Sequence, residues 1–388
     1  MKITKIEYED KEYKWRFEPI CLYSTLTLLV GISGVGKTRI LQSIYNLKKI
    51  ANGASLNGVK WNIEFTDDKQ QEYCWTGEFE TKNKDSILSQ MIDNEDSDND
   101  DFNFIKETLS IFGNPIFTRQ HNKIIYKGQE TPKLSSHISV IDLLSEEEEI
   151  STVQQAFDKI ILSNQEHETD GVNFVSPKLL KRFENTDFYK LQQSSIPLNI
   201  KLLLTYRYHQ DIFNKIKQNF INVFPFIEDV RMQPVDENDF LELPIHIESL
   251  LKELRLIAIK EKTSDYWIKQ PQISSGMLKS FMYIAEIYLL PEGSVVLIDE
   301  FENSLGINCI DSITDNLLSS NRLQFIITSH HLYIINNINP QLWKIVKRRG
   351  GIVETIDASK ISISKSRDKA FYELINYLTE YDEEMYSG

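Results

Sequence analysis

The chain of 388 residues carries 43 Lys and Arg against 57 Asp and Glu, a net charge of −14. With 41% hydrophobic and 26% charged residues its composition is that of a globular protein, and its length suggests two lobes. The acidic balance argues against a general polyanion-binding protein, so a nucleic-acid contact would need a local basic patch. No apolar run is long enough to span a membrane, no secretory signal opens the sequence, and its three cysteines lack CxxC spacing. We therefore expect a cytoplasmic protein that does not contact a membrane.

The first part of the chain predicts strands and one helix around a glycine-rich loop. Two short strands are expected over residues 3–8 and 13–17, and the apolar run 26–30 predicts a buried strand. A helix is expected over 38–49, because apolar residues recur there at helical spacing.

The middle of the chain, residues 61–260, is expected to form an inserted lobe that is compact and mainly helical. Prolines interrupt this region repeatedly, and because proline breaks helices, a long coiled coil is excluded. Strands are predicted over 61–65, 73–79, 115–126, 226–235 and 241–247, and helices over 151–164, 177–184 and 198–223.

The last third alternates helices and strands, which is typical of an α/β fold with parallel strands. A turn around Gly350 and Gly351 predicts a hairpin near the end. Helices are predicted over 276–290, 307–319 and 367–379, and strands over 294–298 and 325–328.

Residues 31–38, GISGVGKT, fit the phosphate-loop pattern G-x-x-x-x-G-K-[ST], between a predicted strand and a predicted helix. Glycines let backbone N–H groups surround phosphates, and the following helix adds partial positive charge. Lys37 can neutralise the β- and γ-phosphates, and the Thr38 hydroxyl can bind Mg²⁺. The candidate nucleotide-binding residues here are Gly31, Ser33, Gly34, Val35, Gly36, Lys37, Thr38 and Arg39.

Two carboxylates, Asp299 and Glu300, follow the predicted buried strand 294–298. Asp299 can support bound Mg²⁺, and Glu300 can orient and deprotonate a water molecule. The pair therefore predicts the hydrolytic side of an ATP site.

Two further motifs favour a particular kind of phosphate-loop protein. Ser274, Ser275 and Gly276 open the predicted helix 276–290, where a helix N-terminus can bind an anion. His330 follows the predicted strand 325–328, where its imidazole can donate a hydrogen bond to a γ-phosphate.

In this order, the motifs resemble the head of ABC-type ATPases, within the branch of chromosome-maintenance, double-strand-break-repair and OLD-type ATPases. The resemblance covers about residues 1–50 and 265–345. It implies an α/β P-loop NTPase fold whose ATPase head consists of residues 1–60 and 261–388, around the inserted lobe with strands near 115–126. It implies ATP and Mg²⁺ as ligands.

The resemblance also implies roles for individual residues. Asp299 supports Mg²⁺, Glu300 is the general base, and His330 senses the γ-phosphate. Gln120, in the predicted strand region, contacts Mg²⁺ and the attacking water. The head acts as a homodimer or higher homo-oligomer: Ser274, Ser275 and Gly276 bind the ATP held by a second subunit, and residues 303–306 cross the interface.

The Ser-Ser-Gly form is typical of the OLD-like, defence-associated branch and disfavours a transporter subunit. Too few residues follow His330 for an appended Toprim nuclease domain. The resemblance thus extends to bacterial anti-phage ATPases such as the PtuA-type ATPases of Septu and retron systems, which pair with a separate HNH-type nuclease. Two alternatives stay open: a low-turnover nucleotide-binding scaffold that holds an effector inactive, and a repair-type ATPase that acts directly on DNA. The basic turn Lys347-Arg348-Arg349 is either a solvated turn or a nucleic-acid contact.

Overall fold

The computed structural model describes residues 1–82, 101–163, 176–234, 255–302, 322–361, 373–374 and 376. The chain forms two compact units, and each unit combines segments that are distant in the sequence. The first consists of Met1–Leu162, Gly293–Asp299 and Arg322–Gly388, and the second of Ser163–Glu292 and Glu300–Asn321. The division of the chain into an ATPase head and an inserted lobe stays a prediction.

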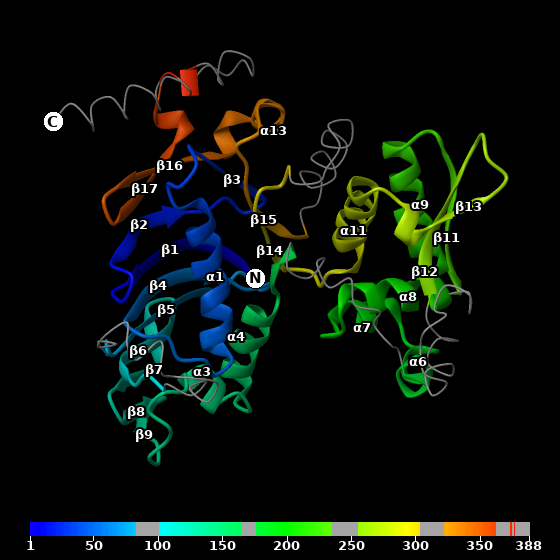
Figure 1. Cartoon of the computed structure of the whole chain (residues 1–388). Helices are drawn as coiled ribbons and strands as arrows, with labels where there is room; N and C mark the ends of the chain where they lie inside the picture. The colour runs from blue at the N-terminus through cyan, green and yellow to red at the C-terminus, as the bar shows by residue number, and fades with distance from the viewer. Residues whose placement is uncertain are drawn as a thin grey trace, which may run out of the picture. The chain divides into compact units, whose positions relative to one another are not determined.

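The first unit is built on one fourteen-stranded sheet with the order β10-β14-β15-β3-β16-β17-β2-β1-β4-β5-β6-β7-β8-β9 (Figure 1). Its strands are β1 (Lys2–Asp10), β2 (Trp15–Cys21), β3 (Leu26–Val30), β4 (Val59–Thr66), β5 (Glu72–Phe79), β6 (Phe104–Ile111), β7 (Asn114–Gln120), β8 (Lys123–Tyr126), β9 (Gln129–Glu130), β10 (Ile160–Leu162), β14 (Val295–Ile298), β15 (Gln324–Thr328), β16 (Trp343–Arg349) and β17 (Ile352–Asp357).

The sheet has a parallel part and an antiparallel part with different burial patterns. Strands β10, β14, β15, β3 and β16 run parallel, and every residue of β3 and β14 is buried. Strands β4 to β9 form an antiparallel meander, and in β4 and β5 buried and less buried residues alternate. These are the patterns expected of strands covered on both faces and of strands with one core face.

Helices α1 (Lys37–Ala51), α3 (Val140–Leu143) and α4 (Glu148–Asp158) pack together beside this sheet (Figure 1). The apolar face of α1 is fully buried and joins a core cluster that reaches from β1 to the meander. The apolar residues of α1 in this cluster are Ile40, Leu41, Ile44, Leu47, Ile50 and Ala51. Burial of this face, more than helix propensity, stabilises α1 on the sheet.

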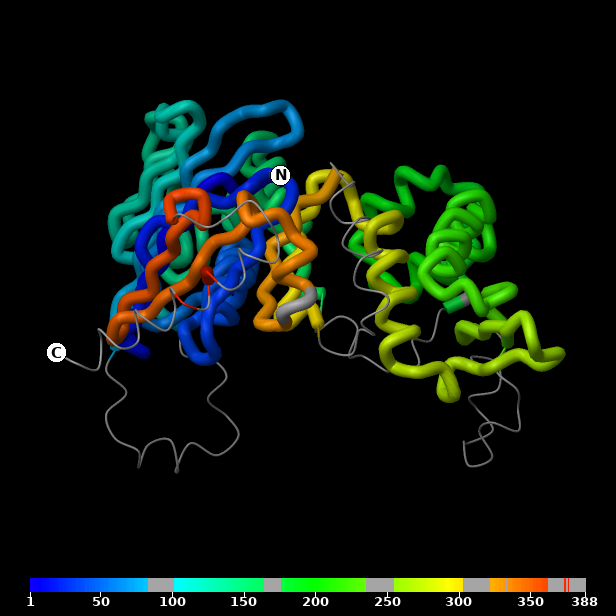
Figure 2. The backbone as a smooth tube through the Cα atoms, turned by 90° about the horizontal axis from the view of Figure 1, so that it is seen from above, coloured from blue at the N-terminus to red at the C-terminus, as the bar shows by residue number. Residues whose placement is uncertain are grey.

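Early and late segments of the chain meet inside this unit, and Figure 2 shows the N-terminal strands beside the late strands. The fully buried Gln324 of β15 donates to the carbonyl oxygens of Ile3 and Tyr23, both at 2.8 Å. It also accepts a hydrogen bond from the Ile3 N–H at 2.7 Å. A buried amide with its donors and acceptors satisfied fixes the position of β15 relative to β1.

A buried ion pair within the antiparallel part of the sheet is connected by hydrogen bonds to the start of α3. The side chains of Glu107 and Arg119 are 0% exposed, and their charged atoms lie 3.6 Å apart. Glu107 also accepts hydrogen bonds from Ser139 Oγ at 2.6 Å and Trp75 Nε1 at 3.0 Å. Burial raises the pKa of Glu107, while the bond from Ser139 opposes this effect. The network satisfies a carboxylate that would otherwise be costly to bury.

The second unit contains a helical group and a small sheet. Helix α11 (Ser275–Leu289) packs on α8 (Leu198–Tyr208) and α9 (Gln210–Val223), with the Phe220 and Phe281 rings 5.2 Å apart. The other helices are α6 (Pro177–Phe183) and α7 (Phe188–Gln193), and the three-stranded sheet β11-β12-β13 consists of Ile227–Pro234, Arg255–Glu261 and Trp267–Lys269.

The predicted α/β fold class is confirmed, and the longest helices in the described ranges have 15 residues, far short of a long coiled coil. Two predicted helices are wrong in part. The helix predicted over 151–164 ends at Asp158, and β10 follows it because parallel pairing with β14 requires an extended chain. The helix predicted over 198–223 breaks at His209, which has φ −133° and ψ 60°.

Some predictions fall on parts of the chain that the structure does not describe. These are the strand over 241–247, the helix over 307–319, most of the C-terminal helix over 367–379, and residues 303–306, which the resemblance places at a subunit interface.

Candidate functional site

The predicted phosphate loop lies between β3 and α1, as its sequence pattern requires. Gly34 and Gly36 have φ values of +81° and +106°, which side chains rarely tolerate. A Cβ atom added at Gly34 would meet nothing within 4 Å, so this glycine faces open space. The loop therefore combines a left-handed backbone with room beside it, which suits a chain that wraps around a phosphate group.

Lys37, the first residue of α1, folds back over its own loop. Its side-chain ammonium donates hydrogen bonds to the carbonyl oxygens of Gly31 at 2.9 Å and Ile32 at 3.0 Å, and the residue is only 8% exposed. Thr38 and Ser33 are exposed. A cation held over the mouth of a glycine loop at a helix N-terminus fits a triphosphate, and the exposed Thr38 hydroxyl fits a magnesium ligand.

Two predicted site residues follow β14 and β15, the two strands on one side of β3. The order β14-β15-β3 is parallel, so the carboxyl ends of these strands share one edge of the sheet. In the register, Ile298 pairs with Ile327, which pairs with Leu28. At about 4.8 Å per strand spacing, this edge brings Asp299 and His330 to the side of the phosphate loop.

Asp299 has a defined partner on the neighbouring strand. Its Oδ1 atom accepts a hydrogen bond of 2.6 Å from the Thr328 hydroxyl. Glu300 follows with φ +46°, a left-handed backbone that is unusual for a residue other than glycine, and it is exposed. Left-handed residues other than glycine occur at turns as well as at functional sites, so this backbone is compatible with the role predicted for Glu300 and does not establish it. His330 is exposed as well.

Ser274, Ser275 and Gly276 begin α11 in the second unit. Ser274 is the N-cap, and its hydroxyl accepts a hydrogen bond of 3.3 Å from the Met277 N–H. Both serines are exposed. This is the geometry of an ordinary serine N-cap, and the exposed N-terminus of α11 could still bind an anion through its backbone N–H groups.

The structure does not bring Gln120 to the phosphate loop. Gln120 ends β7, and seven strands separate β7 from β3 within the sheet. At the usual strand spacing this corresponds to roughly 38 Å along the sheet. The expected contact of Gln120 with Mg²⁺ and water in the same chain is therefore wrong. The strand that contains Gln120 was predicted correctly, but the residue types of this strand do not reveal which strands pair with it in the sheet.

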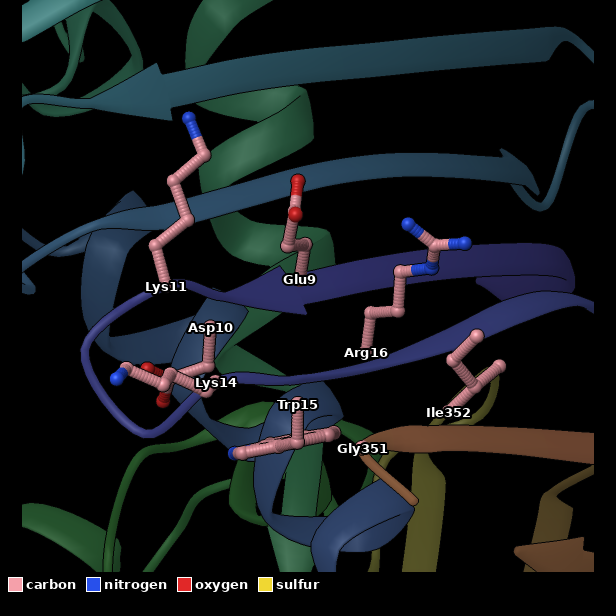
Figure 3. A pocket seen from close by; sticks show the side chains of 8 residues that line it. All are labelled: Glu9, Asp10, Lys11, Lys14, Trp15, Arg16, Gly351 and Ile352. Carbon is pink, nitrogen blue, oxygen red and sulfur yellow. The ribbon is translucent and has the colours of Figure 1, made fainter. Parts of the chain in front are cut away.

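A pocket that sequence reasoning missed lies at the turn between β1 and β2, beside the start of β17 (Figure 3). It measures about 350 Å³, and its lining residues are Glu9, Asp10, Lys11, Lys14, Trp15, Arg16, Gly351 and Ile352. Arg39, in the first turn of α1, lies over the Trp15 ring at 5.3 Å. The signal in the sequence was an aromatic and basic segment, residues 13–17, shortly before the phosphate loop.

Across the part of the chain that the structure describes, no three His, Cys, Asp or Glu side chains gather as a metal cluster. Within the same residues, no helix combines the length and the apolar character needed to cross a bilayer.

Comparison with solved structures gives the fold. A head domain of Smc with an extended coiled coil, bound to the C-terminal domain of ScpA and derived from Pyrococcus furiosus, matches with a TM-score of 0.52 and 13% identity, covering 97% of this chain and 99% of that one. The SMC head domain from Thermotoga maritima matches with a TM-score of 0.44 and 13% identity, covering 92% and 99%. No curated protein sequence matches the chain.

A family model described as "AAA domain, putative AbiEii toxin, Type IV TA system" matches residues 141–336. The matched range includes Ser274, Asp299, Glu300 and His330, whereas the phosphate loop lies before it. This match extends over half of the chain. The chain therefore belongs to this AAA family, and it has the fold of an ABC-type P-loop ATPase head of the SMC kind.

Proposed function

We propose that this protein binds ATP with Mg²⁺ at residues 31–38 and hydrolyses it. The observation that supports the proposal is the parallel order β14-β15-β3, because Asp299, His330 and the phosphate loop each follow the carboxyl end of one of these strands. Family membership and the fold of an SMC-type head support the same reading.

In this proposal the loop N–H groups and Lys37 bind the phosphates, while Thr38 and Asp299 hold Mg²⁺. Bound Mg²⁺ supplies charge neutralisation at the β- and γ-phosphates. Glu300 accepts a proton from the attacking water, and His330 donates a hydrogen bond to the γ-phosphate. The pocket beside Trp15, whose rim carries both basic and acidic side chains, takes the nucleoside end of ATP, since an aromatic ring can pack against a base.

We further propose that two copies close around ATP, so that Ser274, Ser275 and Gly276 of one chain bind the triphosphate on the other. The γ-phosphate then makes contacts only in the closed pair, and hydrolysis releases the pair. We propose that the closed and open states control a separate effector protein, such as an HNH-type nuclease in anti-phage defence. The family description refers to a toxin–antitoxin system, which is in keeping with a role beside a toxic effector.

Phosphate release and native mass, each measured with and without Mg-ATP, test the proposal. We expect wild type to release phosphate and Glu300→Gln to accumulate as a dimer with ATP. Ser274→Ala should bind ATP without dimerising. Binding of ATP with phosphate release no greater than that of Lys37→Ala would favour the nucleotide-binding scaffold. Absence of ATP binding would overturn the proposal.

A further inference from the structure

The hairpin β16–β17, residues 343–357, makes contact with the phosphate loop at three separate points. Arg348 Nε donates to the Gly350 carbonyl oxygen at 2.7 Å within the hairpin, and from there its Nη1 reaches the carbonyl oxygen of Gly34 at 3.4 Å. A Cβ atom at Gly31 would come within 2.5 Å of the Val346 carbonyl oxygen, and one at Gly36 within 3.0 Å of the Val353 side chain. The hairpin thus follows the outer side of the loop from its beginning to its end.

This hairpin is itself firmly held. Strand β16 pairs with β3 directly before the loop, and β17 pairs with β2. At the tip, the Arg16 N–H donates to the Gly351 carbonyl oxygen at 2.9 Å. At the base, the Lys344 ammonium donates to Asp357, which also accepts from the Tyr23 hydroxyl at 3.1 Å. A contact from the hairpin therefore limits the movement of the loop.

The contact at Gly34 has a direct consequence for phosphate binding. The carbonyl of Gly34 and the N–H of Val35 belong to one peptide group, and in a trans peptide these two point in opposite directions. A guanidinium on the carbonyl side leaves the Val35 N–H directed away from the hairpin. A charged donor on the carbonyl also polarises the peptide and strengthens its N–H as a donor.

We propose that Arg348 is a positioning residue for the phosphate loop: from outside, it holds the Gly34–Val35 peptide so that the Val35 N–H is presented to the nucleotide phosphates. This inference rests on the proposed ATP binding at residues 31–38. The inference assigns the basic turn Lys347-Arg348-Arg349 a role in the proposed nucleotide site, whereas the sequence had left open whether this turn is only solvated or contacts nucleic acid. Arg349, next in the chain, is also exposed and provides a matched control of the same charge.

Calorimetric affinities for Mg-ATP and for inorganic tripolyphosphate test this inference in the full chain. We expect Arg348→Ala to weaken both affinities by about threefold to tenfold, because it removes a charge-assisted bond. Arg348→Lys should recover most of the loss, because it restores the cation. Arg349→Ala should bind like wild type, and the melting temperatures of all variants should agree.

Three results would overturn the inference. If Arg348→Ala and Arg349→Ala lower the affinity for Mg-ATP equally, only the general charge of the turn matters. A loss for ATP but not for tripolyphosphate would place Arg348 against the nucleoside rather than the loop. A loss accompanied by a lower melting temperature, with no recovery in Arg348→Lys, would make the residue merely structural. If wild type and Lys37→Ala both fail to bind either ligand, the proposed function itself fails, which is a distinct outcome.

Discussion

The Thr328 hydroxyl donates a 2.6 Å hydrogen bond to Asp299 Oδ1, joining the carboxyl ends of two adjacent parallel strands. This bond holds one carboxylate oxygen toward β15 and so fixes the orientation of the proposed magnesium residue. Partners of this kind commonly affect metal affinity by about 10–100-fold. We expect Thr328→Val to raise the Mg²⁺ concentration for half-maximal ATP hydrolysis about tenfold. Thr328→Ser, which keeps the hydroxyl, should stay near wild type, and an unchanged Mg²⁺ requirement in the valine variant would contradict this role.

Lys37 bonds to two carbonyl oxygens of its own loop, so its ammonium is already positioned above the phosphate site. Lys37→Ala removes these bonds and the charge-assisted bonds to phosphate, each worth about 1.5–3 kcal/mol. We expect ATP binding to become undetectable by calorimetry at micromolar protein. Lys49→Ala, an exposed lysine on the last turn of the same helix, is the control for general loss of charge. Wild-type affinity of Lys37→Ala would refute the proposed site.

Glu300 is exposed and held with φ +46°, next to the proposed magnesium residue. Glu300→Gln keeps the size of the side chain but removes the base, so we expect hydrolysis to slow by about 10²–10⁴-fold with ATP affinity retained. Steady-state phosphate release and nucleotide binding, measured on the same preparation, separate the two effects. Hydrolysis at the wild-type rate would remove Glu300 from the role of general base.

The buried pair Glu107 and Arg119 supports the fold far from the proposed ATP site. Glu107→Ala leaves a buried guanidinium without its counter-charge, and we expect a loss of about 3–5 kcal/mol in the free energy of unfolding. Glu130→Ala, whose side chain is 62% exposed and pairs with Lys123, should cost less than about 1 kcal/mol. Urea unfolding measures both. Equal losses in the two variants would mean that the buried network contributes little.

Asp357 lies at the base of the hairpin that contacts the phosphate loop, and we expect it to make the free energy of unfolding depend on pH. Partial burial opposes ionisation, but the bonds from Lys344 and Tyr23 outweigh it and hold the pKa of Asp357 below its ordinary value of 3.8. A lowered folded-state pKa contributes stability above the unfolded pKa, and this contribution is lost as the pH falls through the folded value.

Urea unfolding of wild type and Asp357→Asn across this pH range tests the dependence. We expect a difference of about 1–3 kcal/mol in the free energy of unfolding at pH 7. The difference should hold down to about pH 5 and narrow below pH 3.8. A difference that is constant down to the lowest accessible pH would show that the carboxylate charge does not act there.

The residues of the proposed nucleotide site were predicted from the sequence. The glycines, Lys37 and Thr38 fall at a fixed spacing between an apolar strand and an amphipathic helix, and the structure places β3 and α1 there. Asp299 and His330 were found in the same way, since each follows a short apolar strand. Motif spacing and short apolar strands depend only on residues a few positions apart, so they can be recognised without knowing the tertiary structure.

Sheet order, in contrast, depends on pairings between residues far apart in the chain. The sequence predicted strands within residues 61–126, but it did not reveal that these strands continue the sheet that begins with β1. Long-range strand pairing also explains the wrong prediction for Gln120, whose strand was predicted but whose distance from β3 was not. It explains β10 as well, because the extended conformation of β10 depends on pairing with β14.

The sequence by itself therefore determined which chemical groups serve the proposed site and which short elements carry them. Only the tertiary structure decided which elements adjoin, including the hairpin that brings Arg348 to Gly34 across more than three hundred residues of chain. The physical reason is that a loop conformation or helix face is fixed by residues a few positions apart. A strand's neighbours, in contrast, are selected by burial and hydrogen bonding over the whole unit.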